Sequence, residues 1–288
     1  MATDQPTLLA VLAHPDDETF GLGGTLALYA SRGTRVYLVC ATRGEVGDVP
    51  PEVMDGYASV GELREAELRC AASKLGLEGV FFLDYRDSGM PGSLDNQHPT
   101  ALAAQPVEKV AGDIVKYIRL LRPQVVLTFD PIGGYRHPDH IAIHRATVKA
   151  FSTAGDPLAY PDSLAPYTPQ RLYFQTVSKK LLRWAVRILP IFGQDPSRLG
   201  NNHDIDLVSV ASEEFPEHVV IDYASVSDCR DQAARCHASQ GGIKMTTGFQ
   251  GWIMKLIRGR ETFMQAYPEW SGDGHKLNDL FTGVDINP

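Results

Sequence analysis

Two short stretches of this chain concentrate histidine and acidic residues at spacings that suit metal chemistry. Residues 13–18 read Ala-His-Pro-Asp-Asp-Glu, and residues 135–140 read Tyr-Arg-His-Pro-Asp-His. Zinc prefers a few nitrogen and oxygen ligands in tetrahedral geometry, and a catalytic zinc site keeps one position open for water. Because both stretches contain imidazole and carboxylate groups, together they predict a metal site for hydrolysis.

His14, Asp17 and His140 would give such a metal two imidazoles and one carboxylate. Asp16 is then a natural general base, because a water polarised by the metal needs a nearby proton acceptor. The simpler alternative is that Asp16 or Asp17 caps a following helix and that His14 lies in a turn, since aspartate is common before helices. The presence of His-Pro-Asp in both stretches favours the metal site.

Each stretch follows an apolar run that predicts a buried parallel strand, at 8–12 and at 125–129. The carboxyl ends of parallel strands meet at one edge of the sheet, so the two stretches are expected to converge. The β-α alternation predicts an α/β fold with a Rossmann-like, mostly parallel doubly wound sheet. Further strands are expected at 35–41, 80–83, 171–177 and 218–223, and helices at 20–30, 61–75, 107–121, 141–150 and 225–238.

The regular alternation changes after residue 176, and this change divides the chain into four parts. Residues 1–176 are expected to form the Rossmann-like metal-binding core. Residues 177–215 are interpreted as an inserted lid or lobe, and residues 216–240 as a strand and a helix that rejoin the core. Residues 241–288 are expected to form a smaller C-terminal lobe over the active-site edge.

The composition is that of an ordinary globular protein with an acidic balance. Lys and Arg number 27 against 35 Asp and Glu, which gives 288 residues a net charge of −8. An acidic surface argues against nucleic acid or an anionic membrane as the main partner. No run approaches 18 consecutive apolar residues and the N-terminus has no basic signal segment, so no stable membrane insertion is expected and a cytoplasmic location is predicted.

The four cysteines, Cys40, Cys70, Cys229 and Cys236, show no Cys-x-x-Cys spacing. Short secreted domains need disulfides because their cores are small, whereas a chain of this length can fold without them. The cysteines are therefore interpreted as reduced and structural.

The two charged stretches resemble the motifs of the PIG-L/LmbE-like family of metal-dependent de-N-acetylases. Residues 13–18 resemble the family's A-H-P-D-D-E motif, and residues 137–140 resemble its H-P-D-H motif at a compatible separation. Within the family, the chain is most similar to the branch that acts on N-acetylglucosaminyl-inositol and related mycothiol-type substrates. That similarity also covers residues 64–68, 85–90, 133–135 and 237–240.

The resemblance implies a zinc ion held by His14, Asp17 and His140, with Asp16 as the base. It leaves iron(II) open as the native metal. It also implies that a protonated His137 steadies the oxyanion of the reaction or protonates the leaving amine.

The resemblance further implies that Tyr135 donates a hydrogen bond to the oxyanion, and that Arg64 and Asp87 contact hydroxyls or a phosphate of the substrate. Asp139 is interpreted as a residue that orients a ligand histidine. Glu45 is either a solvated charge or a further substrate contact.

Three other polar residues near the motifs have weaker signals. Glu18 and Arg136 receive no role from the sequence. His144 lies one helical turn after His140 and on the same helix face, but it is expected to pack or to support a ligand rather than to bind the metal.

The predicted function is removal of the acetyl group from an N-acetylglucosamine-type substrate, such as GlcNAc-inositol, by metal-activated water. One alternative is an amidase that cleaves a larger acyl group or a thiol conjugate from the same sugar. Another is a nucleotide- or sugar-binding module without turnover, supported only by Gly21, Gly23 and Gly24, which do not form G-x-G-x-x-G. The expected partner is a small amino-sugar substrate, and homo-oligomerisation is left open.

Overall fold

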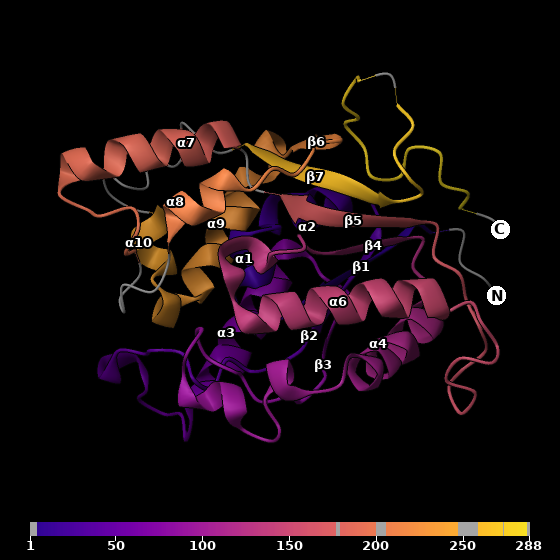
Figure 1. The fold of residues 1–288 in the computed structure, drawn as a ribbon, viewed down its shortest axis with the longest axis horizontal. Coiled ribbons are helices and arrows are strands. Elements are labelled where there is room, and N and C mark those ends of the chain that lie inside the picture. Colours follow the sequence, from indigo (N-terminus) through magenta and orange to yellow (C-terminus); the bar gives the residue numbers. More distant parts are fainter. Residues whose placement is uncertain (1–4, 177–178, 200–205, 247–258, 273, 287–288) are drawn as a thin grey trace.

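A mixed seven-stranded sheet forms the centre of the computed structural model, which describes residues 5–176, 179–199, 206–246, 259–272 and 274–286 (Figure 1). The strands are β1 (Thr7–Leu12), β2 (Arg35–Cys40), β3 (Gly79–Phe82), β4 (Val125–Phe129), β5 (Arg171–Thr176), β6 (Val219–Asp222) and β7 (Arg260–Tyr267). Their order across the sheet is β3-β2-β1-β4-β5-β7-β6. Strands β1 to β5 pair in parallel, and β7 runs antiparallel to β5 and β6.

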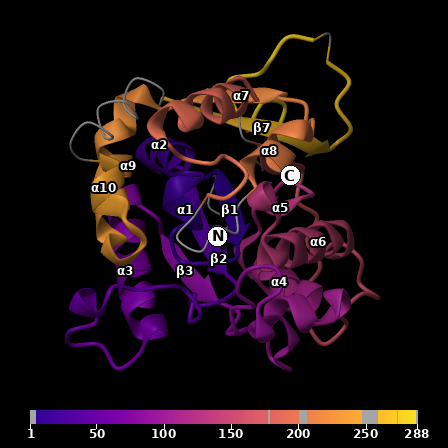
Figure 2. The ribbon, with the colours of Figure 1, turned by 60° about the vertical axis from the view of Figure 1, so that its left-hand side comes forward.

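Helices cover both faces of this sheet. The longer ones are α2 (Gly23–Ser31), α3 (Val60–Leu75), α4 (Val107–Leu121), α6 (Pro138–Thr153), α7 (Lys179–Ile188) and α9 (Ser227–Cys236). The short ones are α1 (Asp17–Phe20), α5 (Gly133–Arg136), α8 (Leu207–Ser212) and α10 (Gly242–Thr246). Helices α3 and α9 pack together on one side of the strands, and α4 and α6 pack together on the other (Figure 2). The predicted doubly wound, Rossmann-like α/β fold is confirmed.

Strand β1 is buried over its whole length because it is apolar and lies between two parallel neighbours, β2 and β4. Leu8, Leu9 and Leu12 have no exposed surface. Full burial of a side chain of this size contributes roughly 1.5–3 kcal/mol relative to exposure. The residues that follow β1 therefore start from a fixed point at the carboxyl edge of the sheet.

The start of α6 is set by a proline and a histidine. Pro138 occupies the first helical turn, where a missing N–H costs little, and the side chain of His137 caps the helix by accepting a hydrogen bond from the N–H of Asp139. This local structure places His140 in the first turn of α6, facing the end of β1.

The position of strand β7 differs from the expected domain division. The sequence pattern assigns residues 241–288 to a separate lobe, whereas Arg260–Tyr267 pairs with β5 and β6 inside the sheet. The pattern misses this strand because the polar Thr262 and Gln265 are among its buried residues, so hydrophobic alternation is weak. The strand expected at 218–223 is present as β6.

The described part of residues 177–215 forms α7 and α8, which pack against each other; residues 177–178 and 200–205 lie outside the described residues. Helix α8 also packs against α5, so the segment lies beside the loop that follows β4. Within the described ranges, no helix combines the length and apolar character needed to span a membrane.

A disulfide joins Cys70 of α3 to Cys236 at the end of α9, which corrects the expectation that all four cysteines are reduced. The two Cα atoms are 5.8 Å apart although 166 residues separate them in sequence. Only the packing of α3 on α9 brings them together, so no local spacing reveals the pair. Cys40 and Cys229 are free. Because disulfides persist mainly in oxidising compartments, this bond does not support the cytoplasmic location, which stays a prediction.

Candidate functional site

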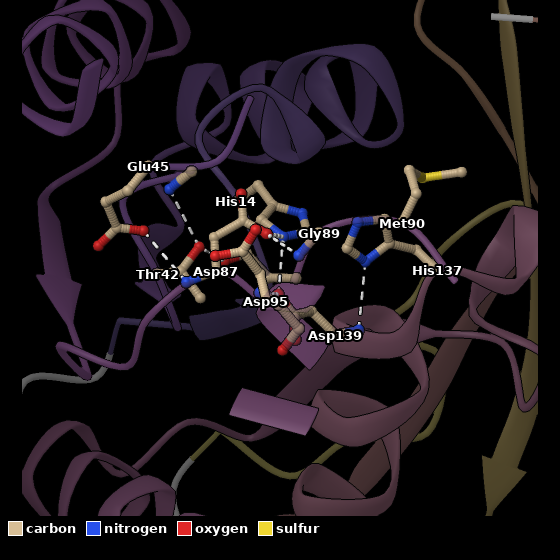
Figure 3. A network of polar contacts seen from close by, with 12 residues as sticks. His14, Thr42, Glu45, Asp87, Gly89, Met90, Asp95, His137 and Asp139 are labelled. Atoms are coloured by element: carbon tan, nitrogen blue, oxygen red, sulfur yellow. Dashed lines mark hydrogen bonds and ion pairs between the residues drawn. The ribbon is translucent and has the colours of Figure 1, made fainter. Parts of the chain in front are cut away.

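The two charged stretches meet at the carboxyl edge of the sheet, as their positions after β1 and β4 predict. The ring centroid of His14 lies 4.6 Å from that of His137 and 5.2 Å from that of His140. Figure 3 shows His14 and His137 in one polar network with Asp87, which follows β3, and Asp139 of α6. Residues from three strand ends thus converge on one point.

His14, Asp17 and His140 face one another through one ring nitrogen of each histidine and the two carboxylate oxygens of Asp17. Nδ1 of His14 lies 3.2 Å from Nε2 of His140. The two carboxylate oxygens of Asp17 lie 3.3 Å from the same His140 nitrogen and 3.6 Å from the same His14 nitrogen. Two ligands of a tetrahedral zinc ion, each about 2.0–2.1 Å from the metal, are about 3.3–3.4 Å apart. The spacing of these three side chains therefore fits a shared metal ion.

The outer nitrogens of both imidazoles support the same conclusion. Nε2 of His14 lies 3.1 Å from Asp139 Oδ2, and Nδ1 of His140 lies 3.2 Å from the carbonyl oxygen of Gly133. Both partners are acceptors, so in the neutral rings each outer nitrogen carries the proton and each inner nitrogen presents a lone pair. Two such nitrogens and a carboxylate that face one another can share one cation. The donor set thus fits a divalent metal.

Charge around His14 favours a cation at this place. Burial lowers the pKa of His14, but the carboxylates of Asp87, Asp139 and Asp17 outweigh burial and raise that pKa well above its usual value. Burial would raise the pKa of Asp17, but His140 and His14 lower it well below its usual value, so Asp17 is a carboxylate. The surroundings stabilise positive charge next to an anionic ligand.

Asp139 is fully buried and holds His14 from behind. Its Oδ2 accepts hydrogen bonds from Nε2 of His14 and, at 2.9 Å, from the N–H of Ser88, while the Ser88 hydroxyl donates to Oδ1. The carboxylate of Asp87 lies 3.5 Å from the same His14 nitrogen. This arrangement matches the supporting contact expected of Asp139.

Asp16 precedes the candidate ligand Asp17 in the chain and lies, with His14, on the wall of a cavity. One of its carboxylate oxygens accepts a hydrogen bond of 3.1 Å from Nη2 of Arg64. The same Nη2 donates to the carbonyl oxygen of Pro15, and Nη1 donates to that of Gly44. Burial raises the pKa of Asp16 to about 6, although the Arg64 guanidinium acts in the opposite direction. Arg64 lines the cavity and its hydrogen bonds go to the protein, so its contact with substrate stays a prediction.

His137 and Tyr135 lie on the same cavity wall. Nδ1 of His137 accepts the N–H of Asp139 at 3.2 Å, so the proton of the neutral ring is on Nε2 and can be donated. Burial lowers the pKa of His137, and His14 and His140 lower it further, so the neutral ring prevails where the resemblance implies a protonated one. Burial raises the pKa of Tyr135, which keeps its hydroxyl a donor.

A turn at the end of β4 places Tyr135. The preceding Gly134 has φ 66° and ψ −78°, a conformation that residues with a Cβ rarely adopt. The carboxylate of Asp130 fixes this turn by accepting hydrogen bonds from the N–H groups of Ile132, at 3.1 Å, and Gly134, at 2.9 Å. The Gly-Gly-Tyr motif thus gives the backbone a turn that places the Tyr135 ring beside His137 and His140.

The cavity in front of these side chains has a volume of about 440 Å³. It is lined by His14, Asp16, Val46, Gly47, Asp48, Arg64, Asp87, Gly89, Met90, Pro91, Ser93, Tyr135, His137 and Gln240. None of these residues belongs to the described parts of 177–215. Loops after β2 and β3, rather than the inserted segment, therefore form most of the far wall.

Three residues near the motifs lie elsewhere. Glu45 does not line the cavity, and its carboxylate accepts the N–H of Asp87 at 3.2 Å. Arg136 turns away and donates a hydrogen bond of 2.8 Å to Glu213 after α8. His144 is packed as expected, with Nδ1 2.8 Å from the carbonyl oxygen of Phe129.

Sequence reasoning missed several cavity residues. Asp48, Met90 and Ser93 follow strand ends, which is a general signal for a site, but nothing in their residue types points to a specific role. Gln240 reaches the cavity from beyond α9. The only signal for it was the short motif at 237–240, which is weak when taken alone.

Comparisons with known proteins agree with this site. The family model described as "PIG-L: GlcNAc-PI de-N-acetylase" matches residues 9–151. The 1D-myo-inositol 2-acetamido-2-deoxy-alpha-D-glucopyranoside deacetylase of Thermobifida fusca (strain YX) is 35% identical over 287 residues, which cover 95% of this chain and 98% of that protein. The chain belongs to the PIG-L family. The PIG-L protein is also 38% identical over 314 residues to the enzyme of the same name from Kineococcus radiotolerans, with 98% and 84% covered.

Solved structures of low identity share the fold of this PIG-L protein. N,N'-diacetylchitobiose deacetylase from Pyrococcus horikoshii has a TM-score of 0.61 at 21% identity, with 91% of this chain and 84% of that chain covered. The 4-carboxy-2-hydroxymuconate hydratase from Pseudomonas putida KT2440 has a TM-score of 0.60 at 17% identity, with 93% and 99% covered. Because a deacetylase and a hydratase share this fold, its function has to be argued from the side chains of the site.

Proposed function

We propose that this PIG-L protein is a zinc-dependent deacetylase that releases acetate from an N-acetylglucosamine unit joined to inositol. One observation carries the proposal: lone pairs of His14 and His140 and the carboxylate of Asp17 face one another at the spacing of metal ligands, and Asp16 lies beside them on the cavity wall. The names of relatives that match nearly the whole chain support the choice of substrate.

The metal ligands in this proposal are His14 Nδ1, His140 Nε2 and a carboxylate oxygen of Asp17. When bound there, zinc would polarise the amide carbonyl and the attacking water. Asp16 removes a proton from that water while the water oxygen bonds to the carbonyl carbon of the acetyl group. A carboxylate with a pKa near 6 is suited to this task, because it is both ionised and basic at neutral pH.

Tyr135 and His137 act on the other side of the reacting carbonyl. Both are hydrogen-bond donors on the cavity wall, and they stabilise the negative charge that develops on the carbonyl oxygen. The C–N bond then breaks, and the proton held by Asp16 passes to the departing amine nitrogen. The products are acetate and a free amino sugar.

The remaining cavity residues are proposed to bind the sugar. Asp87 and Arg64 keep their predicted role as contacts to substrate hydroxyls, and Asp48 and Gln240 join them on the wall. Glu45 supports this set from behind by fixing the backbone of Asp87. A cavity of about 440 Å³ is within the usual range for a small-molecule site.

Acetate release from N-acetylglucosaminyl-inositol tests the proposal. The purified protein is assayed with this substrate, with free N-acetylglucosamine and with a thiol conjugate of the same sugar, and its metal content is measured without added metal. Stoichiometric zinc and a preference for the first substrate are expected. Preferred cleavage of the thiol conjugate would make the protein an amidase instead. Metal-free protein that binds the sugar without turnover would point to a binding module.

A further inference from the structure

Asp16 has an unusual backbone conformation for the residue that is proposed as the base. Its φ is 116° and its ψ is −30°, in a region that residues with a Cβ rarely adopt. Such a conformation persists only when surrounding contacts hold it in place. The contacts around Asp16 therefore determine where its carboxylate points.

Glu18 contacts this backbone at its N–H, while the Asp16 carbonyl oxygen accepts the N–H groups of Thr19 and Phe20 in α1. The Glu18 side chain is fully buried, and its Oε2 accepts a hydrogen bond of 2.9 Å from the N–H of Asp16. Oε1 accepts a hydrogen bond from Nε2 of His237 at 2.7 Å and another from the Thr19 hydroxyl. A carboxylate only accepts hydrogen bonds, so both sides of Glu18 are used at once.

His237 is also fully buried, and residues before and after it in the chain are joined to α3. Ser239 donates two hydrogen bonds to the carboxylate of Glu67, 2.8 Å from its N–H and 2.6 Å from its hydroxyl. The preceding Cys236 is joined to Cys70 by the disulfide. His237 is thus fastened to the helix that also carries Arg64.

Helix α3 is therefore connected to Asp16 in two ways, one direct and one through other residues. Arg64 contacts the carboxylate directly, and the Glu18–His237 pair contacts the backbone from the opposite, buried side. Asp16 lines the cavity, whereas Glu18 and His237 do not. The pair thus contacts the Asp16 backbone but not the cavity.

We propose that Glu18 and His237 are positioning residues, which hold Asp16 in its left-handed backbone conformation and thereby aim its carboxylate at the cavity. The expected effect on kcat rests on the proposed deacetylase function. The expected effect on the Asp16 conformation does not depend on that function, so the two effects are tested separately.

A crystal structure of the Glu18→Gln variant tests the structural part. A glutamine side chain has one accepting and one donating end, so while Nε2 of His237 carries the proton it cannot replace both contacts that Glu18 makes. The expected result is that Asp16 leaves the positive-φ region or that its carboxylate separates from Arg64. An unchanged Asp16 would overturn the inference, whatever the protein hydrolyses.

Kinetics test the consequence for turnover. Glu18→Gln is expected to lower kcat roughly 10- to 100-fold, with KM and zinc content little changed, because a small misplacement of a reacting group has an effect of this size. In an Asp16→Ala background, Glu18→Gln should cause no further loss of kcat. Losses that multiply in the double variant, or a loss of zinc from Glu18→Gln, would show that Glu18 does not act through Asp16.

Two further variants guard against general destabilisation. Glu261→Gln changes a carboxylate away from Asp16, one that accepts the backbone N–H groups of Gly24 and Thr25, and should leave kcat unchanged. If Glu18→Gln does not fold, His237→Gln, which keeps a donor, is compared with His237→Leu, which has none. Higher kcat in His237→Gln supports the inference, and equal kcat overturns it. Wild-type protein that releases no acetate would refute the proposed function and leave the crystallographic test in force.

Discussion

Nδ1 of His14 and Nε2 of His140 lie 3.2 Å apart, although 126 residues separate the two histidines in sequence. Their outer nitrogens contact a carboxylate and a backbone carbonyl, so in the neutral rings the inner nitrogens present lone pairs to the space between them. A metal bound there would take both nitrogens as ligands. Variants that remove a ligand should therefore lose both metal and activity, whereas variants that remove only the base should lose activity alone.

Asp16→Ala and His140→Ala should differ in what they lose. Asp16→Ala removes the base but no ligand, so zinc content should stay near that of the wild type while kcat falls by about 10²- to 10⁴-fold. His140→Ala removes a ligand, so both zinc and turnover should be lost. Metal analysis by mass spectrometry together with acetate release separates the two variants. A wild-type rate in Asp16→Ala would exclude it as the base.

Asp139→Asn should weaken metal binding without removing a ligand. The carboxylate orients His14 through a 3.1 Å hydrogen bond, and loss of such support typically costs about 10- to 100-fold in metal affinity or activity. Competition with a chelator gives the affinity. Asp156→Asn is a matched control, because the Asp156 carboxylate caps a distant exposed turn through the N–H of Leu158. Equal affinities in the two variants would contradict the role of Asp139.

Stability should depend on His144 at mildly acidic pH. Burial lowers the pKa of His144 in the folded protein below its usual 6.5. At a pH between this lowered pKa and 6.5, the unfolded chain binds a proton at His144 that the folded chain does not. Its contribution to stability is complete above pH 6.5 and is lost as pH falls through the folded-state pKa. His144→Gln should therefore flatten the acidic side of the stability curve, measured by urea unfolding from pH 7 to pH 5. Parallel curves would refute this assignment.

Reduction of the disulfide should lower the free energy of unfolding. The Cys70–Cys236 bond closes a loop across 166 residues, and a native disulfide typically contributes about 2–4 kcal/mol. Cys70→Ser and Cys236→Ser should each lower the denaturant midpoint, and a reductant should lower the midpoint of the wild type but not of the variants. Cys229→Ser, at a free cysteine, is the control. A wild type insensitive to reductant would mean that the bond does not form in solution.

Much of the site could be predicted because its parts follow strand ends. The motifs containing His14 and His140 come directly after apolar runs, and neighbouring parallel strands bring such positions together without further information. The cap formed by His137 and Pro138 is equally local. In these cases residue type and chain position determine the geometry.

The features that sequence reasoning missed depend on packing between distant segments. The hydrogen bonds from Arg64 to Pro15 and Asp16 depend on where α3 places Arg64 against the end of β1. The pairing of Cys70 with Cys236 requires α3 to lie on α9. Strand β7 is recognisable only from its neighbours β5 and β6, because its own residues alternate weakly.

The hydrogen bond between Glu18 and His237 spans 219 residues, and this has a consequence for the order in which the protein matures during translation. All three proposed metal ligands lie within the first 140 residues, so a nascent chain can collect them while most of α9 is still unmade. The partner of Glu18 is made only near the end of synthesis, and a domain folds as a unit. The contact that holds the Asp16 backbone therefore forms only after nearly the whole chain has been made.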